Sequence, residues 1–78
     1  MNLVEALTRE IERVTELREQ YREIQAMSDR GDFPNKVLTQ PAVAGMTQAL
    51  EAAHQAMAEH GDIEKTGRAL KRLQDFTG

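Results

Sequence analysis

Residues 2–27 contain neither glycine nor proline, and their apolar side chains recur at every third or fourth position. This spacing places the apolar side chains on one face of an α-helix, so it predicts a long amphipathic helix at the start of the chain. Asn2, followed three residues later by Glu5, is a suitable N-cap for it. The predicted apolar stripe comprises Val4, Leu7, Ile11, Val14, Leu17, Tyr21, Ile24 and Met27.

The length of this helix bears on assembly. At 1.5 Å per residue it would extend about 39 Å, more than a compact bundle of 78 residues needs. The apolar residues of its stripe are on average fewer than 3.5 positions apart. On a straight helix of 3.6 residues per turn the stripe therefore winds around the helix, and one partner helix cannot cover all of it. We therefore expect one end to project or to pack on another subunit, and we predict a homo-oligomer.

The second half of the chain has the signals of a helical hairpin. Pro41 is suited to the first turn of a helix, Gly61 to a helix stop, and Asp62 to the N-cap of the next helix. The apolar residues expected to face inward are Val43, Met46, Leu50, Ala53 and Met57, then Ile63, Thr66, Ala69, Leu70, Leu73 and Phe76. Seven of the ten alanines fall within 41–60, which would let another helix approach this segment closely.

These signals predict a single all-α domain over residues 1–78. It is a three-helix protein in which one long N-terminal helix is followed by a loop and an antiparallel αα-hairpin. The predicted helices cover about 3–28, 41–60 and 63–76, and the irregular loop covers 29–40.

The loop at 29–40 is long for so small a domain, and loops of this length are often functional. Gly31 is suited to a left-handed helix C-cap, and Pro34 disfavours helix around it. Phe33, Val37 and Leu38 are apolar. The loop is therefore either a lid over the core or a binding element, and both interpretations remain open.

Composition excludes several classes of function. The net charge of −3 is too small and too mixed for a dedicated DNA-binding protein. The chain has no cysteine, hence no disulfide, thiolate metal site or cysteine nucleophile. It also lacks an apolar run long enough for a membrane span and a basic–apolar leader. We expect a soluble cytoplasmic protein.

No catalytic or cofactor motif emerges from the sequence. Glu51 and His54 have the Glu-x-x-His spacing of di-iron bundles, but such a site needs a second copy of the motif and further inward carboxylates. The glycines form neither a dinucleotide fingerprint nor a phosphate loop, and no hydroxyl lies in a nucleophile elbow. We therefore predict no enzyme, no catalytic residue, no metal and no cofactor.

The best candidate for a binding site is a basic stripe on the third predicted helix. Lys65, Arg68 and Arg72 lie at i, i+3 and i+7, so they share one face and could hold the phosphates of a small nucleotide. Residues 62–78 carry a net charge of +1, from four bases and three acids, whereas residues 1–61 sum to −4. Tyr21 is a further candidate contact. An ordinary solvated helix face is the alternative interpretation.

The segments TREIERVTELREQYREI and GMTQALEAAHQAMAEHGDIEKTGRALKRLQDF resemble small α-helical proteins of tailed phages and prophages. These often pair a Glu/Arg-rich first helix with an alanine-rich helix, a Gly-Asp turn and a short last helix. The resemblance implies a phage accessory protein that acts by stoichiometric binding, such as an inhibitor of host immunity. It implies no particular functional residue.

Two hypotheses follow. The first is a non-enzymatic binding module that blocks a host defence protein or sequesters a nucleotide signal, such as a cyclic nucleotide. The second is a structural or assembly adaptor that docks on a phage or host protein through the apolar surface of its first helix.

Overall fold

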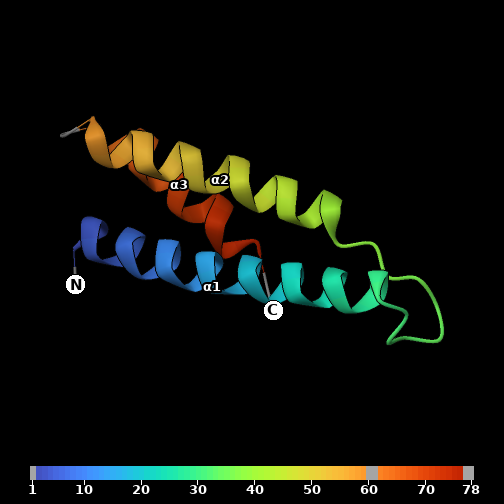
Figure 1. The fold of residues 1–78 in the computed structure, drawn as a ribbon. Coiled ribbons are helices and arrows are strands. Elements are labelled where there is room, and N and C mark those ends of the chain that lie inside the picture. The colour runs from blue at the N-terminus through green and yellow to red at the C-terminus, as the bar shows by residue number, and fades with distance from the viewer. Residues whose placement is uncertain (1, 60–61, 77–78) are drawn as a thin grey trace.

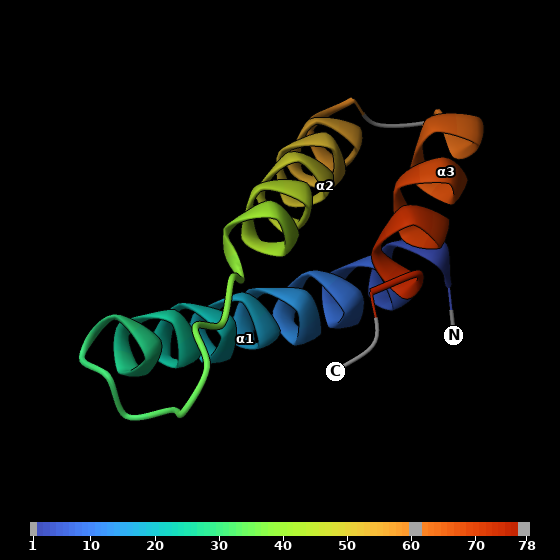
Figure 2. The ribbon, with the colours of Figure 1, turned by 90° about the vertical axis from the view of Figure 1, so that its right-hand side faces the viewer.

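The computed structural model describes residues 2–59 and 62–76, which form three α-helices and no strand. These are α1 (Leu3–Asp29), α2 (Gln40–Ala58) and α3 (Ile63–Gln74). They run up, down and up around a common core, and α3 ends near the middle of α1 (Figures 1 and 2). The molecule is elongated, with extents of 48 × 20 × 16 Å. The predicted all-α, three-helix architecture is confirmed.

The helix ends follow from capping residues. The side chain of Asn2 accepts a hydrogen bond from the Glu5 amide at 2.8 Å, and that of Asp62 accepts one from the Lys65 amide at 3.0 Å. Gly31 has φ = 85°, a left-handed conformation that suits glycine. The helices differ from the predicted ranges by one or two residues, since α1 ends at Asp29, α2 covers 40–58 and α3 ends at 74. The predicted stop at Gly61 and the neighbouring His60 lie outside the described residues.

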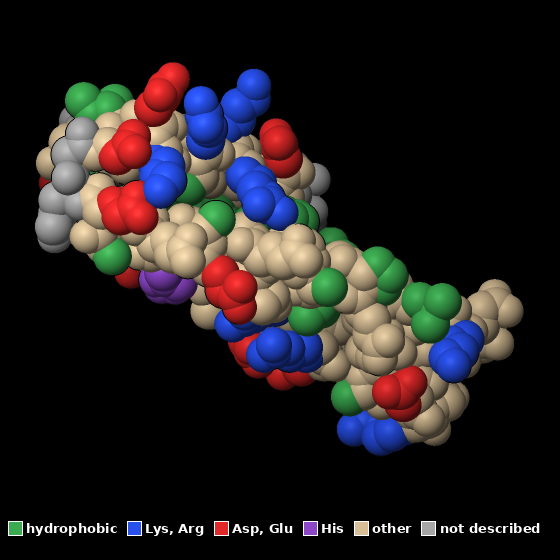
Figure 3. Space-filling view, turned by 90° about the horizontal axis from the view of Figure 1, so that it is seen from above, with side chains coloured by type: hydrophobic (Ala, Val, Ile, Leu, Met, Phe, Trp, Pro, Cys, Tyr) green, Lys and Arg blue, Asp and Glu red, His purple; other side chains and the backbone are tan. Residues whose placement is uncertain are grey.

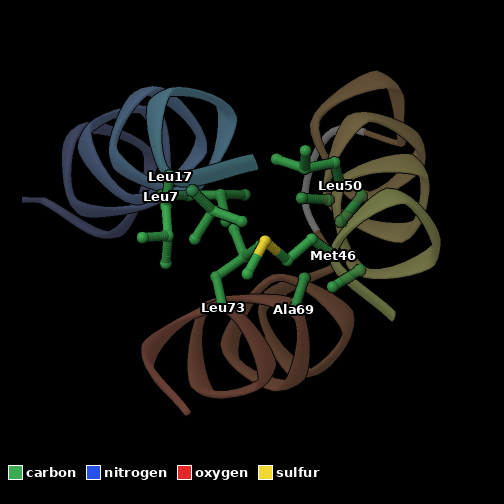
Figure 4. Close-up of a cluster of buried hydrophobic side chains, with 10 residues drawn as sticks. Leu7, Leu17, Met46, Leu50, Ala69 and Leu73 are labelled. Atoms are coloured by element: carbon green, nitrogen blue, oxygen red, sulfur yellow. The ribbon is translucent and has the colours of Figure 1, made fainter. Parts of the chain in front are cut away.

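The core is built from all three helices, whose buried side chains meet along the bundle axis (Figure 4). Small residues on α2 keep this core narrow, and the aromatic ring of Phe76 lies 3.5 Å from the position that a Cβ of Gly45 would take. The buried apolar residues are Leu7, Val14, Leu17, Met46, Ala49, Leu50, Ala53, Ala56, Ala69 and Leu73.

Three residues predicted to face inward are exposed. Ile63 is 75% exposed, Val4 56% and Met27 36%. Each lies in the first or last turns of its helix, where the neighbouring helices do not cover the apolar face. Helical periodicity identified the correct face of α1 but not the length over which that face is covered.

The loop between α1 and α2 returns along the end of α1 and is fixed there by side-chain hydrogen bonds. Thr39, which is buried, donates its amide to Gln25 Oε1 at 2.7 Å and its hydroxyl to the Tyr21 carbonyl at 3.0 Å. The Val37 amide donates to Ser28 Oγ at 2.8 Å. Leu38, between these two anchored residues, is 70% exposed, so it is not part of a lid over the core.

Gly67 provides a test of α3 stability. It lies inside α3, and a Cβ built on it would meet no atom within 4 Å beyond its immediate neighbours. We expect Gly67→Ala to stabilise the protein by about 1 kcal/mol, because alanine loses less backbone entropy in a helix. Urea unfolding followed by circular dichroism measures the change. Gly31→Ala is the contrasting control and should destabilise the protein by about 1 kcal/mol, since its φ is positive.

Candidate functional site

The three basic residues predicted from their spacing lie together in the structure. Lys65, Arg68 and Arg72 line one side of a groove between α2 and α3, with a volume of about 180 Å³. The remainder of the groove is formed by small and uncharged side chains. These are Ala52, Gln55, Ala56 and Ala69. An anionic group in the groove would thus contact cations on one side and a flat, weakly polar surface on the other.

The three cations already have polar neighbours in the free protein. Lys65 Nζ donates to Glu59 Oε2 at 2.5 Å, and an Arg68 nitrogen lies 3.6 Å from Glu64 Oε1. Arg72 donates to the side-chain oxygen of Gln48 at 3.5 Å. Figure 3 accordingly shows basic and acidic side chains interspersed over the end of the molecule that contains α3.

Because these contacts are exposed to solvent, each cation can exchange its present partner for a group of a ligand. The Lys65 and Glu59 side chains are 52% and 53% exposed, and those of Arg68 and Glu64 are 77% and 84% exposed. Ion pairs at this exposure contribute little to stability, so a phosphate can replace the carboxylate partners. The hydrogen bond that Lys65 donates to Glu59, followed by the negative charge of that carboxylate, raises the pKa of Lys65 above its usual 10.5. Lys65 is therefore a cation throughout the physiological pH range.

Tyr21, the fourth candidate, is not brought together with these cations. It lies on α1, is half-buried, and packs against the core cluster instead of lining the groove. Lys71 is exposed on α3 but also does not line the groove. The candidate binding site therefore contains three of the four residues predicted from the sequence, Lys65, Arg68 and Arg72, but not Tyr21.

Sequence reasoning missed the wall of the groove that α2 supplies. This wall consists of Ala52, Gln55 and Ala56, of which the last two follow Ala52 by three and four positions, so all three share one helical face. That spacing was available in the sequence, but nothing in it indicated that this face of α2 adjoins the basic face of α3.

A second hollow, of about 310 Å³, lies between the end of α1 and the start of α2. It is larger, but its lining includes both Arg22 and Asp29, and Arg22 forms an ion pair with Glu19 at 2.8 Å. Because it concentrates neither sign of charge, we assign the candidate site to the α2–α3 groove.

Metal ligands do not cluster in the part of the chain that the structure describes. Glu51 and His54 are both exposed on α2, and residues 2–59 and 62–76 contain no group of three or more His, Cys, Asp or Glu side chains arranged to hold a metal ion.

The fold and groove define a small three-helix protein with a basic groove between its second and third helices. No protein family matches this chain, and neither a curated protein nor a solved structure shows significant similarity to it. Among the described residues, no helix combines the length and apolar character required to cross a membrane.

Proposed function

We propose that this chain is a small non-enzymatic binding module that binds the phosphate groups of a nucleotide in the α2–α3 groove. One observation carries this proposal: Lys65, Arg68 and Arg72 converge on a single groove. Three exposed cations that line one groove can provide charge-assisted hydrogen bonds to the same anion, whereas the hollow between α1 and α2 has one cation, Arg22, together with Asp29.

The size of the groove limits what one chain can bind. Small-molecule pockets usually measure about 300–1,000 Å³, whereas this groove has about 180 Å³. One groove therefore accommodates a phosphate and its immediate surroundings, and the remainder of a nucleotide extends outside it. Complete enclosure would require a second subunit, which agrees with the proposed homo-oligomer.

The biological role we propose rests on the resemblance to small phage proteins. In the host cytoplasm such a module would act stoichiometrically, by sequestering a nucleotide signal of bacterial immunity, such as a cyclic nucleotide, or by binding a host defence protein. Neither mode requires a catalytic residue or a cofactor.

Calorimetric titration with cyclic di-AMP, at low and moderate salt, tests the nucleotide proposal. We expect the double variant Arg68→Glu, Arg72→Glu to bind at least about tenfold more weakly, because it replaces two attractive charges by two repulsive ones. Raising the salt concentration should weaken wild-type binding, since the contacts are solvent-exposed.

Lys71→Glu is the matched control. It reverses a charge in the same last turn of α3 as Arg72, but Lys71 does not line the groove. The control should retain wild-type affinity. If the wild type does not bind at millimolar ligand, or if the double variant binds as tightly as the wild type, the groove is not a site for this nucleotide.

The adaptor is the second candidate, and the exposure of Val4 favours it. Val4 and Met27, the exposed apolar residues at the two ends of α1, are 23 positions apart, or about 35 Å along a helix. They cannot form one patch, so an adaptor would dock at one end of α1. If the chain is an adaptor, Val4→Asp should abolish binding of its partner protein, whereas the double variant Arg68→Glu, Arg72→Glu should still bind it.

A further inference from the structure

One end of the bundle, which we call the head, carries an apolar groove that has no partner within the described chain. It is formed where α1 and α3 begin, has a volume of about 170 Å³, and is lined by Leu3, Val4, Asp62, Ile63 and Thr66. Ile63 and Val4 are among the four exposed large hydrophobic residues of the described chain. The groove is of a size to accept one large apolar side chain.

The rim of the head groove is acidic. Asp62 lines it, and Glu5 and Glu64 are exposed in the first turns of the same two helices. Glu64 lies 3.6 Å from Arg68, whereas Glu5 and Asp62 form no ion pair within residues 2–59 and 62–76. Charge complementarity therefore favours an occupant that combines an apolar side chain with a nearby cation.

Such a segment exists at the opposite end of this chain. Leu38 is 70% exposed, and Lys36, two residues before it, is exposed and forms no ion pair with the described residues. The hydrogen bonds of Val37 to Ser28 and of Thr39 to Gln25 hold the backbone on both sides of Leu38. Leu38 is thus presented on a pre-ordered segment, which lowers the entropy lost on binding.

We propose that the head groove binds the segment 36–38 of a second copy of this chain. Leu38 of one subunit packs against Val4 and Ile63 of the next, while Lys36 lies near the acidic rim. The two surfaces lie at opposite ends of a 48 Å molecule, so the contact is head-to-tail and generates a ring or an open chain. A symmetric head-to-head contact would instead place Glu5 and Asp62 near their own copies.

Complementation between two variants tests this geometry. Ile63→Glu disables the head and leaves the tail intact, whereas Leu38→Glu disables the tail and leaves the head intact. In sedimentation velocity we expect the wild type to associate with increasing concentration and each variant alone to remain monomeric. An equimolar mixture of the two variants should form a 1:1 heterodimer and nothing larger, because one functional head and one functional tail remain.

Both substitutions are at exposed positions, so the variants should retain the helical circular dichroism and the unfolding midpoint of the wild type. Ala44→Glu adds the same charge at an exposed position of α2 and should leave association unchanged. The proposal is overturned if the wild type is monomeric at millimolar concentration, which would leave the groove for another protein. It is also overturned if Leu38→Glu associates like the wild type, as a symmetric head contact requires, or if the mixture stays monomeric.

Discussion

Leu73→Ala is expected to reduce the free energy of unfolding by about 3–4 kcal/mol. Leu73 is fully buried in the core cluster, and its side chain points toward Met46 of α2 (Figure 4). Its backbone carbonyl accepts a hydrogen bond from Arg13 of α1 at 2.9 Å. The buried residues of α3 are Thr66, Ala69 and Leu73, so Leu73 is the largest buried side chain by which α3 is attached. Its truncation removes apolar burial and leaves a cavity where three helices meet.

Leu38→Ala is the matched control for this prediction. It deletes the same atoms from a side chain that is 70% exposed, and we expect a change below about 0.5 kcal/mol. Urea unfolding at a protein concentration where the chain is monomeric measures both changes. If Leu73→Ala unfolds in buffer, the Gly67→Ala background supplies the stability needed to measure it. Equal losses at the two positions would contradict the arrangement of the core.

Most of the fold could be predicted from short-range signals. Asn2, Gly31 and Asp62 act at the helix ends as their residue types suggest, and the helix ranges agree within two residues. The errors at Val4 and Ile63 have a common physical cause. Periodicity shows which face of a helix is apolar, but the burial of a given residue depends on whether another helix reaches it in space.

The candidate site was less predictable because it is made by two helices. The spacing of Lys65, Arg68 and Arg72 places them on one face of α3, because residues three or four positions apart in a helix lie on the same side. This placement depends only on residues that are close in sequence. Neither the wall contributed by α2 nor the separation of Tyr21 from the groove follows from local spacing. The outward orientation of Leu38 also depends on long-range contacts, namely the hydrogen bonds that attach the neighbouring loop residues to α1.

Ala53→Leu should destabilise the protein by about 2–3 kcal/mol. Ala49 and Ala53 have no exposed surface within a single chain, so these two small residues of α2 are already covered by the rest of the bundle. A leucine at position 53 forces these helices apart or distorts the surrounding side chains. Urea unfolding measures the loss, with Ala44→Leu, an exposed position on the same helix, as a control that should change little.

This variant also decides whether the alanine-rich surface packs within the chain or between chains. If Ala53 contacted another subunit, Ala53→Leu would alter association while leaving the monomer as stable as the Ala44→Leu control. A loss of stability that is independent of protein concentration places the close helix packing inside the subunit. Self-association must then use surfaces that the bundle leaves uncovered, and the two large apolar side chains with the highest exposed fractions among the described residues, Ile63 and Leu38, lie at its two ends (Figure 1).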